Sequence, residues 1–295
     1  MHPVFIANRE GGEKVANNAL DLNNLRLAVL IDAENVPRNC IKSVMEEIAI
    51  YGIPTIKRIY GDWTNPAISG WKASLLENAI TPIQQYSYTI GKNSSDSAMI
   101  IDAMDILYTE KTDGFVIVSS DSDFTRLAIR LREAGQRVIG IGERKTPNAF
   151  IAACDKFTYI EVIRAGGEET QTMHDETRPG HYEIHQDHDE HDNRQNTHNR
   201  DKQTHTSRLR GLKVPDSVEN LIADSVADLA GDDGVVFMGE LGNLILKKQP
   251  DFDHRNFGYK SLSAMIKSIE RFEIDFRQTA DPNIKHVFVR DKEAT

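Results

Sequence analysis

Short apolar runs alternate with helical patterns through the first half of the chain, and this alternation constrains the fold more than any other feature. The runs have the length of buried strands, and they cover residues 25–31, 53–60, 82–88, 114–120 and 137–142, with 157–162 as a sixth candidate. Strands that alternate with helices form βαβ crossovers around a buried parallel sheet. The sequence therefore predicts an α/β domain in which helices flank a parallel sheet.

The first helix has the clearest boundaries. Pro37 stands at a plausible first helical position, Asn35 precedes it as the candidate N-cap, and Gly52 follows the last apolar residue of the pattern. Proline is favoured in the first helical turn and glycine just past the last. We expect this helix to connect the first two strands of the sheet.

A polar segment divides the chain into two periodic regions. Residues 166–210 contain almost no apolar side chains, so the segment cannot bury enough surface to offset the entropy of ordering it. We predict a 1–24 N-terminal extension, a 25–165 α/β domain, a 166–210 disordered linker and a 211–293 second domain. Six linker histidines have spacings that would align on a helix and hold a transition metal, but in a disordered tether they would bind metal only adventitiously. They are His181, His185, His188, His191, His198 and His205.

The second region reads as three helices followed by a hairpin. An amphipathic helix starts near Pro215, further helices cover 238–248 and roughly 261–269, and two strand-like runs flank the turn-forming ADPN at 280–283. Three helices and a hairpin form a winged helix-turn-helix. The predicted fold class is therefore α/β with a small winged helix-turn-helix domain.

Composition narrows the functional classes. The 295 residues carry 45 acidic and 35 basic side chains, for a net charge of −10, which excludes a chain that grips polyanions through bulk positive charge. The only cysteines, Cys40 and Cys154, exclude a disulfide scaffold and a Cys-rich zinc module and fit a reducing cytoplasm. No apolar stretch approaches the roughly 20 residues that span a bilayer, and the first residues carry no export signal. We expect a cytoplasmic protein without membrane contact.

Four aspartates follow the predicted strands at one edge of the sheet. Asp32 ends the first strand, Asp121 and Asp123 follow the fourth, and Asp96 opens the helix after the third. With strand order 3-2-1-4-5, strands one and four meet at the switch point where ligands bind in open parallel sheets. Converging carboxylates attract a cation, and all-oxygen ligation suits Mg²⁺ or Mn²⁺. Such an ion lowers the pKa of bound water and clamps phosphate oxygens.

Structural explanations compete with this one at each position. Asp32, Asp96, Asp121 and Asp123 could each cap a helix, and Asn35 could be a cap alone or could also orient Asp32. Their joint placement at one edge favours the metal site. Asp102 lies six residues after Asp96, about 120° around the helix, and is therefore a poorer ligand candidate.

Four segments carry a family resemblance. LAVLIDAENVP, RIYGDWTNP, KNSSDSAMIIDAMD and VIVSSDSDFTRLAIRLREAGQRVIGIG resemble the successive motifs of NYN domains, of the PIN-like nuclease superfamily, in the bacterial branch related to LabA. The resemblance implies a metal-dependent ribonuclease fold with Asp32, Asp96 and Asp121 in the acidic pocket, Asp123 close by and Asn35 matching the family's Asn. One departure is Asn93, where many relatives carry glycine after the lysine. Because several PIN-like domains have lost activity, a non-catalytic RNA- or protein-binding regulator is the alternative to a ribonuclease, which we expect to be endonucleolytic.

The segment GELGNLILKKQPDFDHRNFGYKSLSAMIKSIERFEI resembles the LOTUS, or OST-HTH, domain. That family is implicated in RNA binding and in protein contacts, so single-stranded or structured RNA, or a protein, is the expected partner. Basic and aromatic side chains that could hold phosphates and stack on unpaired bases gather in this part of the sequence. They are Lys247, Lys248, Arg255, Phe257, Tyr259 and Lys260. Alternatively, the aromatic side chains belong to the core and the charges form a solvated face.

Overall fold

A computed structural model describes residues 25–86, 94–109, 111–166, 213–231, 233–278 and 285–294. The predicted 1–24 extension, the six linker histidines and Asn93 lie outside these residues. The predictions made for them therefore stay predictions.

The apolar runs of the first domain form a six-stranded sheet in the order β3-β2-β1-β4-β5-β6, with every described pairing parallel. Its strands are β1 (Arg26–Asp32), β2 (Ile53–Gly61), β3 (Thr81–Gln84), β4 (Gly114–Val118), β5 (Arg137–Gly142) and β6 (Lys156–Tyr159). The predicted α/β fold and strand order are confirmed. Because β1 and β4 are neighbours, the chain segments that follow them emerge side by side at the carboxyl edge of the sheet.

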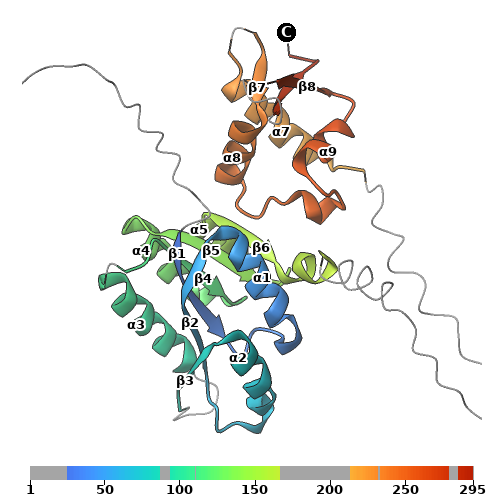
Figure 1. Ribbon diagram of the computed structural model, residues 1–295. Helices are drawn as coiled ribbons and strands as arrows, with labels where there is room; N and C mark the ends of the chain where they lie inside the picture. The colour runs from blue at the N-terminus through green and yellow to red at the C-terminus, as the bar shows by residue number, and fades with distance from the viewer. Residues whose placement is uncertain are drawn as a thin grey trace, which may run out of the picture.

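Helices cover both faces of this sheet (Figure 1). They are α1 (Ile41–Tyr51), α2 (Lys72–Asn78), α3 (Ser94–Tyr108), α4 (Thr125–Glu133) and α5 (Asn148–Ala153). Successive β1 side chains point to opposite faces: Val29 belongs to the core with Val44 of α1, and Leu30 belongs to the core with Met99 of α3. Both cores are apolar, which explains why β1 is a continuous apolar run rather than an alternating one.

Two local predictions are wrong at element ends. Asn35 does not cap the first helix, because Pro37 is the N-cap of a short 3-10 helix, Arg38–Cys40, that leads into α1. The sixth strand ends at Tyr159 instead of residue 162, because residues 160–166 are helical.

The second domain has the predicted helices and hairpin and one further short strand. Its elements are α7 (Asp216–Leu229), β7 (Val235–Phe237), α8 (Met238–Lys248), α9 (Leu262–Lys267), β8 (Phe272–Gln278) and β9 (Lys285–Asp291). The strands form an antiparallel sheet in the order β7-β9-β8, which packs on the helices around a core that includes Ile222, Leu241 and Met265. This is a winged helix-turn-helix.

The second domain contacts the first along β6 and the end of α1 (Figure 1). The backbone N–H of Phe157 donates a 2.8 Å hydrogen bond to the carbonyl of Pro250, and Arg255 forms an ion pair with Glu47. Helix α1 runs back to the amino edge of the parallel sheet, so its last turn lies at the end opposite to the four aspartates.

Candidate active site

Three elements bring the aspartates to the carboxyl edge of the sheet. Asp32 is the last residue of β1 and is buried, with 1% of its surface exposed. Asp121 and Asp123 lie in the loop and short 3-10 helix (Ser122–Phe124) that join β4 to α4. Asp96 lies in the first turn of α3, which packs against β1. The sheet thus converges side chains that are up to 91 residues apart in the sequence.

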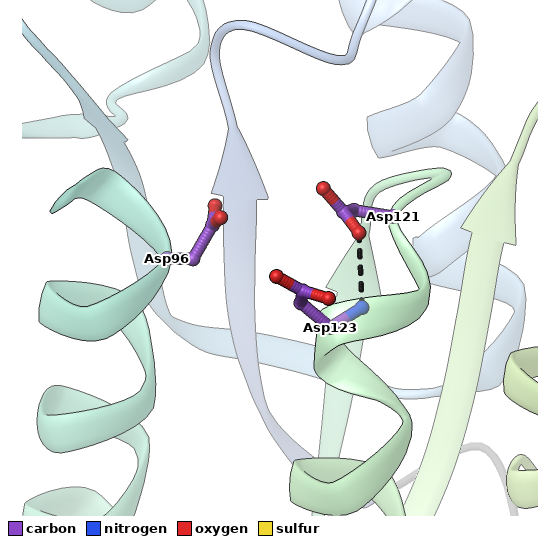
Figure 2. Close-up of side chains that lie close together, drawn as sticks. All are labelled: Asp96, Asp121 and Asp123. Carbon is purple, nitrogen blue, oxygen red and sulfur yellow. Dashed lines mark hydrogen bonds between the residues drawn. The ribbon is translucent and has the colours of Figure 1, made fainter. Parts of the chain in front are cut away.

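Asp96, Asp121 and Asp123 form one cluster, in which a carboxylate oxygen of each lies within 4.8 Å of the others. Figure 2 shows Asp96 projecting from α3 toward the loop that carries the other two. Asp121 Oδ1 accepts a 2.9 Å hydrogen bond from the backbone N–H of Asp123, which fixes the turn between them. Asp96 is buried, Asp121 is half-buried and Asp123 is exposed, so the cluster opens toward solvent on the Asp123 side.

Asp32 lies beside this cluster and is not one of its three members. Its carboxylate accepts hydrogen bonds from the backbone N–H of Glu34 (3.0 Å), from Asn35 Nδ2 (2.7 Å) and from Ser119 Oγ (2.9 Å). Asn35 therefore orients Asp32, which was one of its two predicted roles. The metal ligands predicted from the sequence were Asp32, Asp96 and Asp121, whereas the geometric cluster has Asp123 in the place of Asp32.

Sequence reasoning missed Ser119. This residue directly follows β4, is fully buried, and joins two strands: its hydroxyl donates to Asp32 and accepts a 3.1 Å hydrogen bond from the backbone N–H of Asp121. The only signal in the sequence was a hydroxyl residue between a buried strand and an Asp-rich turn. That pattern does not specify a partner 87 residues away.

The acids raise one another's affinity for positive charge. Burial, and then the charges of Asp32, Asp121, Asp123 and Glu34, raise the pKa of Asp96 from 3.8 to about 6. Burial, and then Asp32 and Asp62, also raise the pKa of Glu34. A proton or a cation relieves this repulsion, and the all-oxygen donor set fits a hard divalent cation.

Asp102 is directed away from the cluster. It accepts hydrogen bonds of 2.5 Å from Arg58 Nη1 and from the hydroxyl of Tyr60, both on β2. Its charge is thus compensated by an arginine, in contrast to the charge of Asp96.

The residues predicted to bind RNA are differently placed on the second domain. Lys247 and Lys260 are exposed and have no ion pair within the described residues. Lys248 pairs with Asp228 at 2.7 Å. Phe257 and Tyr259 are half-buried and pack against the domain core, so only part of each ring is available for stacking.

Arg255 is occupied by carboxylates in this conformation. Its Nη1 and Nη2 donate to the two oxygens of Glu47 at 2.8 and 2.7 Å, and Nε and Nη2 donate to Asp253 at distances between 2.7 and 3.0 Å. Arg255 is thus engaged with the first domain, through its ion pair with Glu47.

A six-stranded parallel sheet flanked by helices fits the NYN/PIN-like α/β fold. Residues 26–161 match the NYN domain family, and residues 213–284 match the OST-HTH/LOTUS domain family. The chain thus contains an NYN domain followed by a C-terminal OST-HTH/LOTUS domain.

Two solved structures resemble parts of the chain. A crystal structure of a protein of unknown function from Vibrio parahaemolyticus is 19% identical, with a TM-score of 0.40, and the match covers 47% of this chain and 94% of that one. A solution structure of an uncharacterised protein from Nitrosomonas europaea is 27% identical, with a TM-score of 0.24, and the match covers 32% and 94%. No curated protein matches the chain significantly.

NYN nucleases and LOTUS domains bind RNA, so the two domains together indicate an RNA-related function. Within the described ranges, every helix is too short or too polar to cross a membrane.

Proposed function

We propose that this protein is a cytoplasmic, LabA-like ribonuclease that uses Mg²⁺ or Mn²⁺ to cleave RNA endonucleolytically and recruits its substrate through the C-terminal domain. One observation carries the proposal: three carboxylates from two distant segments converge within 4.8 Å at the switch point of an NYN domain. Burial, and then the charges of the neighbouring acids, raise the pKa of Asp96, so a cation that neutralises these charges would be favoured at the site.

The roles of the acids follow from their contacts. Asp96, Asp121 and Asp123 would hold the cation, because their oxygens already share one space. Asp32 would act as a fourth carboxylate beside them, and the hydrogen bonds from Asn35 and Ser119 fix its orientation before substrate arrives. A bound divalent ion supplies an activated water and neutralises charge on the phosphate.

These four aspartates would also position the reacting groups of the RNA. Phosphoryl transfer depends on holding the attacking and leaving oxygens in line, so carboxylates with fixed orientations reduce the entropy that must be lost on the way to the transition state. The loop from Ser119 to Asp123 is held by two internal hydrogen bonds and by its link to β1. In our proposal, this loop keeps its shape whether or not RNA is bound.

The C-terminal domain would capture RNA through Lys247 and Lys260, which are exposed, assisted by Lys248, Arg255, Phe257 and Tyr259. The domain carries net negative charge, so capture would depend on these local cations. A captured strand would be held at high local concentration near the acidic site.

The test is cleavage of labelled single-stranded RNA by the purified full-length chain, with Mg²⁺, with Mn²⁺ and with chelator. We expect cleavage with either metal and none with chelator. Asp121→Asn and Asp96→Asn should each lower the rate by orders of magnitude, because each removes a charge from the metal site.

Asp105→Asn is the matched control, because Asp105 is an exposed residue of the same helix as Asp96 and lies about 13 Å further along its axis. Equal activity in Asp121→Asn and Asp105→Asn would exclude the proposed site. RNA binding without any metal-dependent cleavage would instead favour the non-catalytic regulator.

A further inference from the structure

The two domains are joined by a charged cluster that we call the domain latch: Glu47 of α1, and Asp253 and Arg255 of the second domain. Glu47 and Asp253 are 5% and 8% exposed, so both carboxylates are removed from water. Arg255 bridges them, with two hydrogen bonds to Glu47 at 2.8 and 2.7 Å and three to Asp253. Planar, bidentate pairing of this kind is specific to arginine.

Residues of the first domain complete the latch. The hydroxyl of Tyr51 donates a short hydrogen bond to Glu47, and Tyr51 also contacts Thr158 at 3.1 Å. The ammonium group of Lys156 lies 5.6 Å from the centre of the Tyr51 ring. Burial opposes ionisation of Glu47, but the hydrogen bonds from Arg255 and Tyr51 prevail and lower its pKa. The charge of Lys156 also interacts with Asp253 and Glu47, although burial lowers the pKa of the Lys156 ammonium.

Two further hydrogen bonds join the domains beside the latch. Strand β6 is an edge strand that pairs with β5, and its Phe157 N–H donates outward to the carbonyl of Pro250 at 2.8 Å. The hydroxyl of Tyr159 donates to Asp251 Oδ2 at 2.7 Å. The second domain therefore provides hydrogen-bond partners for two residues of the edge strand, Phe157 and Tyr159.

In the latch, Arg255 donates to Glu47 and Asp253 the same N–H groups that it would offer to an RNA phosphate. A phosphate binds arginine through parallel N–H groups on the same edge of the guanidinium as a carboxylate. In the docked conformation Nε, Nη1 and Nη2 of Arg255 all donate to carboxylates. A phosphate and Glu47 are therefore alternative partners of Arg255.

We propose that the NYN domain and RNA compete for Arg255, so that the second domain binds RNA through this face only after the latch opens and its contact with β6 is released. The inference rests on the RNA-recruiting role proposed above. Opening is energetically accessible, because the cost of removing charges from water offsets most of the attraction in a buried ion pair. The apparent affinity for RNA is then the affinity of the open form multiplied by the fraction of molecules in which the latch is open.

Docking is measured without RNA through the hydrogen exchange of the Phe157 amide in the full-length chain. Glu47→Arg places a cation against Arg255 and should accelerate this exchange at least tenfold. Glu46→Arg is the matched control, because Glu46 is the exposed neighbour of Glu47 and the charge change is the same. Far-UV circular dichroism and a cooperative urea unfolding transition like that of the wild type check that the Glu47→Arg chain folds. Equal exchange in Glu47→Arg and Glu46→Arg would overturn the latch.

Competition is measured by the binding of a labelled single-stranded RNA to the same variants. Glu47→Arg should bind RNA at least threefold more tightly than Glu46→Arg, Glu47→Gln should shift affinity in the same direction by less, and RNA added to the wild-type chain should accelerate exchange at Phe157. Equal affinities in the two arginine variants would overturn the competition while leaving the recruiting role intact. Absence of RNA binding in every variant would overturn the recruiting role itself.

Discussion

Ser119 and Asp32 are joined by a 2.9 Å hydrogen bond across the boundary between β4 and β1, although 87 residues separate them in the sequence. The same hydroxyl accepts the backbone N–H of Asp121. One buried side chain thus sets the distance between the carboxylate that ends β1 and the loop that carries two acids of the cluster.

Ser119→Ala should therefore damage both stability and the acidic site. It leaves the half-buried N–H of Asp121 without its partner and removes a donor from the buried Asp32, which we expect to cost about 1–2 kcal/mol of unfolding free energy. Urea unfolding measures this cost, and the cleavage assay measures the loss of activity. Ser122→Ala alters an exposed serine in the same loop and should change neither quantity. If Ser119→Ala changed neither the unfolding free energy nor the activity, the hydrogen bond between the two strands would be dispensable.

Asp96 should make the stability of the metal-free protein depend on pH. Its pKa is raised from 3.8 to about 6 in the folded state, so the folded chain binds a proton more tightly than the unfolded chain. This contribution to stability is fully present below about pH 4 and is lost as the pH rises through 6, and it amounts to at most about 3 kcal/mol.

Asp96→Asn should remove the loss of stability that ionisation of Asp96 causes at high pH. With chelator present, we expect the variant to be more stable than the wild type at pH 7.5 and to lose most of this advantage at pH 4.5, as measured by urea unfolding. Asp105→Asn should parallel the wild type at both values. An advantage of the same size at both pH values would point to a cause other than the charge of Asp96.

Metal binding should relieve the repulsion between Asp96 and the neighbouring acids. Mn²⁺ or Mg²⁺ added at pH 7.5 should raise the melting temperature of the wild type, because a ligand that binds only the folded state stabilises it. Asp123→Asn should weaken this response, as should Asp96→Asn, whereas Asp105→Asn should keep it. If Asp32→Asn abolished the response and Asp123→Asn preserved it, Asp32 rather than Asp123 would be the third ligand.

RNA capture should depend on the exposed lysines of the second domain. Charge reversal of Lys247 and Lys260 should weaken binding and flatten its dependence on salt, because fewer counterions are released when phosphate contacts are lost. Reversal of Lys213 and Lys292 removes the same charge from elsewhere on the domain and should have a smaller effect. Binding across a salt series checks both. If the two double variants behaved alike, Lys247 and Lys260 would be part of a solvated face.

The centre of the sheet was predictable because β1, β4 and β5 are buried on both faces along almost their whole length. A run such as residues 27–31 has no polar position, and in a chain that alternates with helices only a central parallel strand accommodates it. The strand order then placed Asp32 next to Asp121 without further information. In contrast, β7 has three residues and carries no recognisable pattern, so the sequence did not reveal it.

The finer features depend on partners that local patterns do not encode. Asn35 fits a helix cap by its spacing, but its amide is used by Asp32, and the helix starts later behind Pro37. The assignment of Arg255 to RNA followed from its basic neighbours. Its observed partner, Glu47, is 208 residues away, and only the docked tertiary structure brings the two together.

The hydrogen bond from Phe157 to Pro250 also covers part of the outer edge of the parallel sheet. An edge strand with free N–H groups is a template on which a second copy of the sheet can add its own edge. Pro250 fills one such position from within the same molecule. A fragment that ends at residue 165 would lose this cover and expose β6 together with the buried carboxylate of Glu47. We therefore expect the isolated first domain to be more prone to aggregate through this edge than the intact chain.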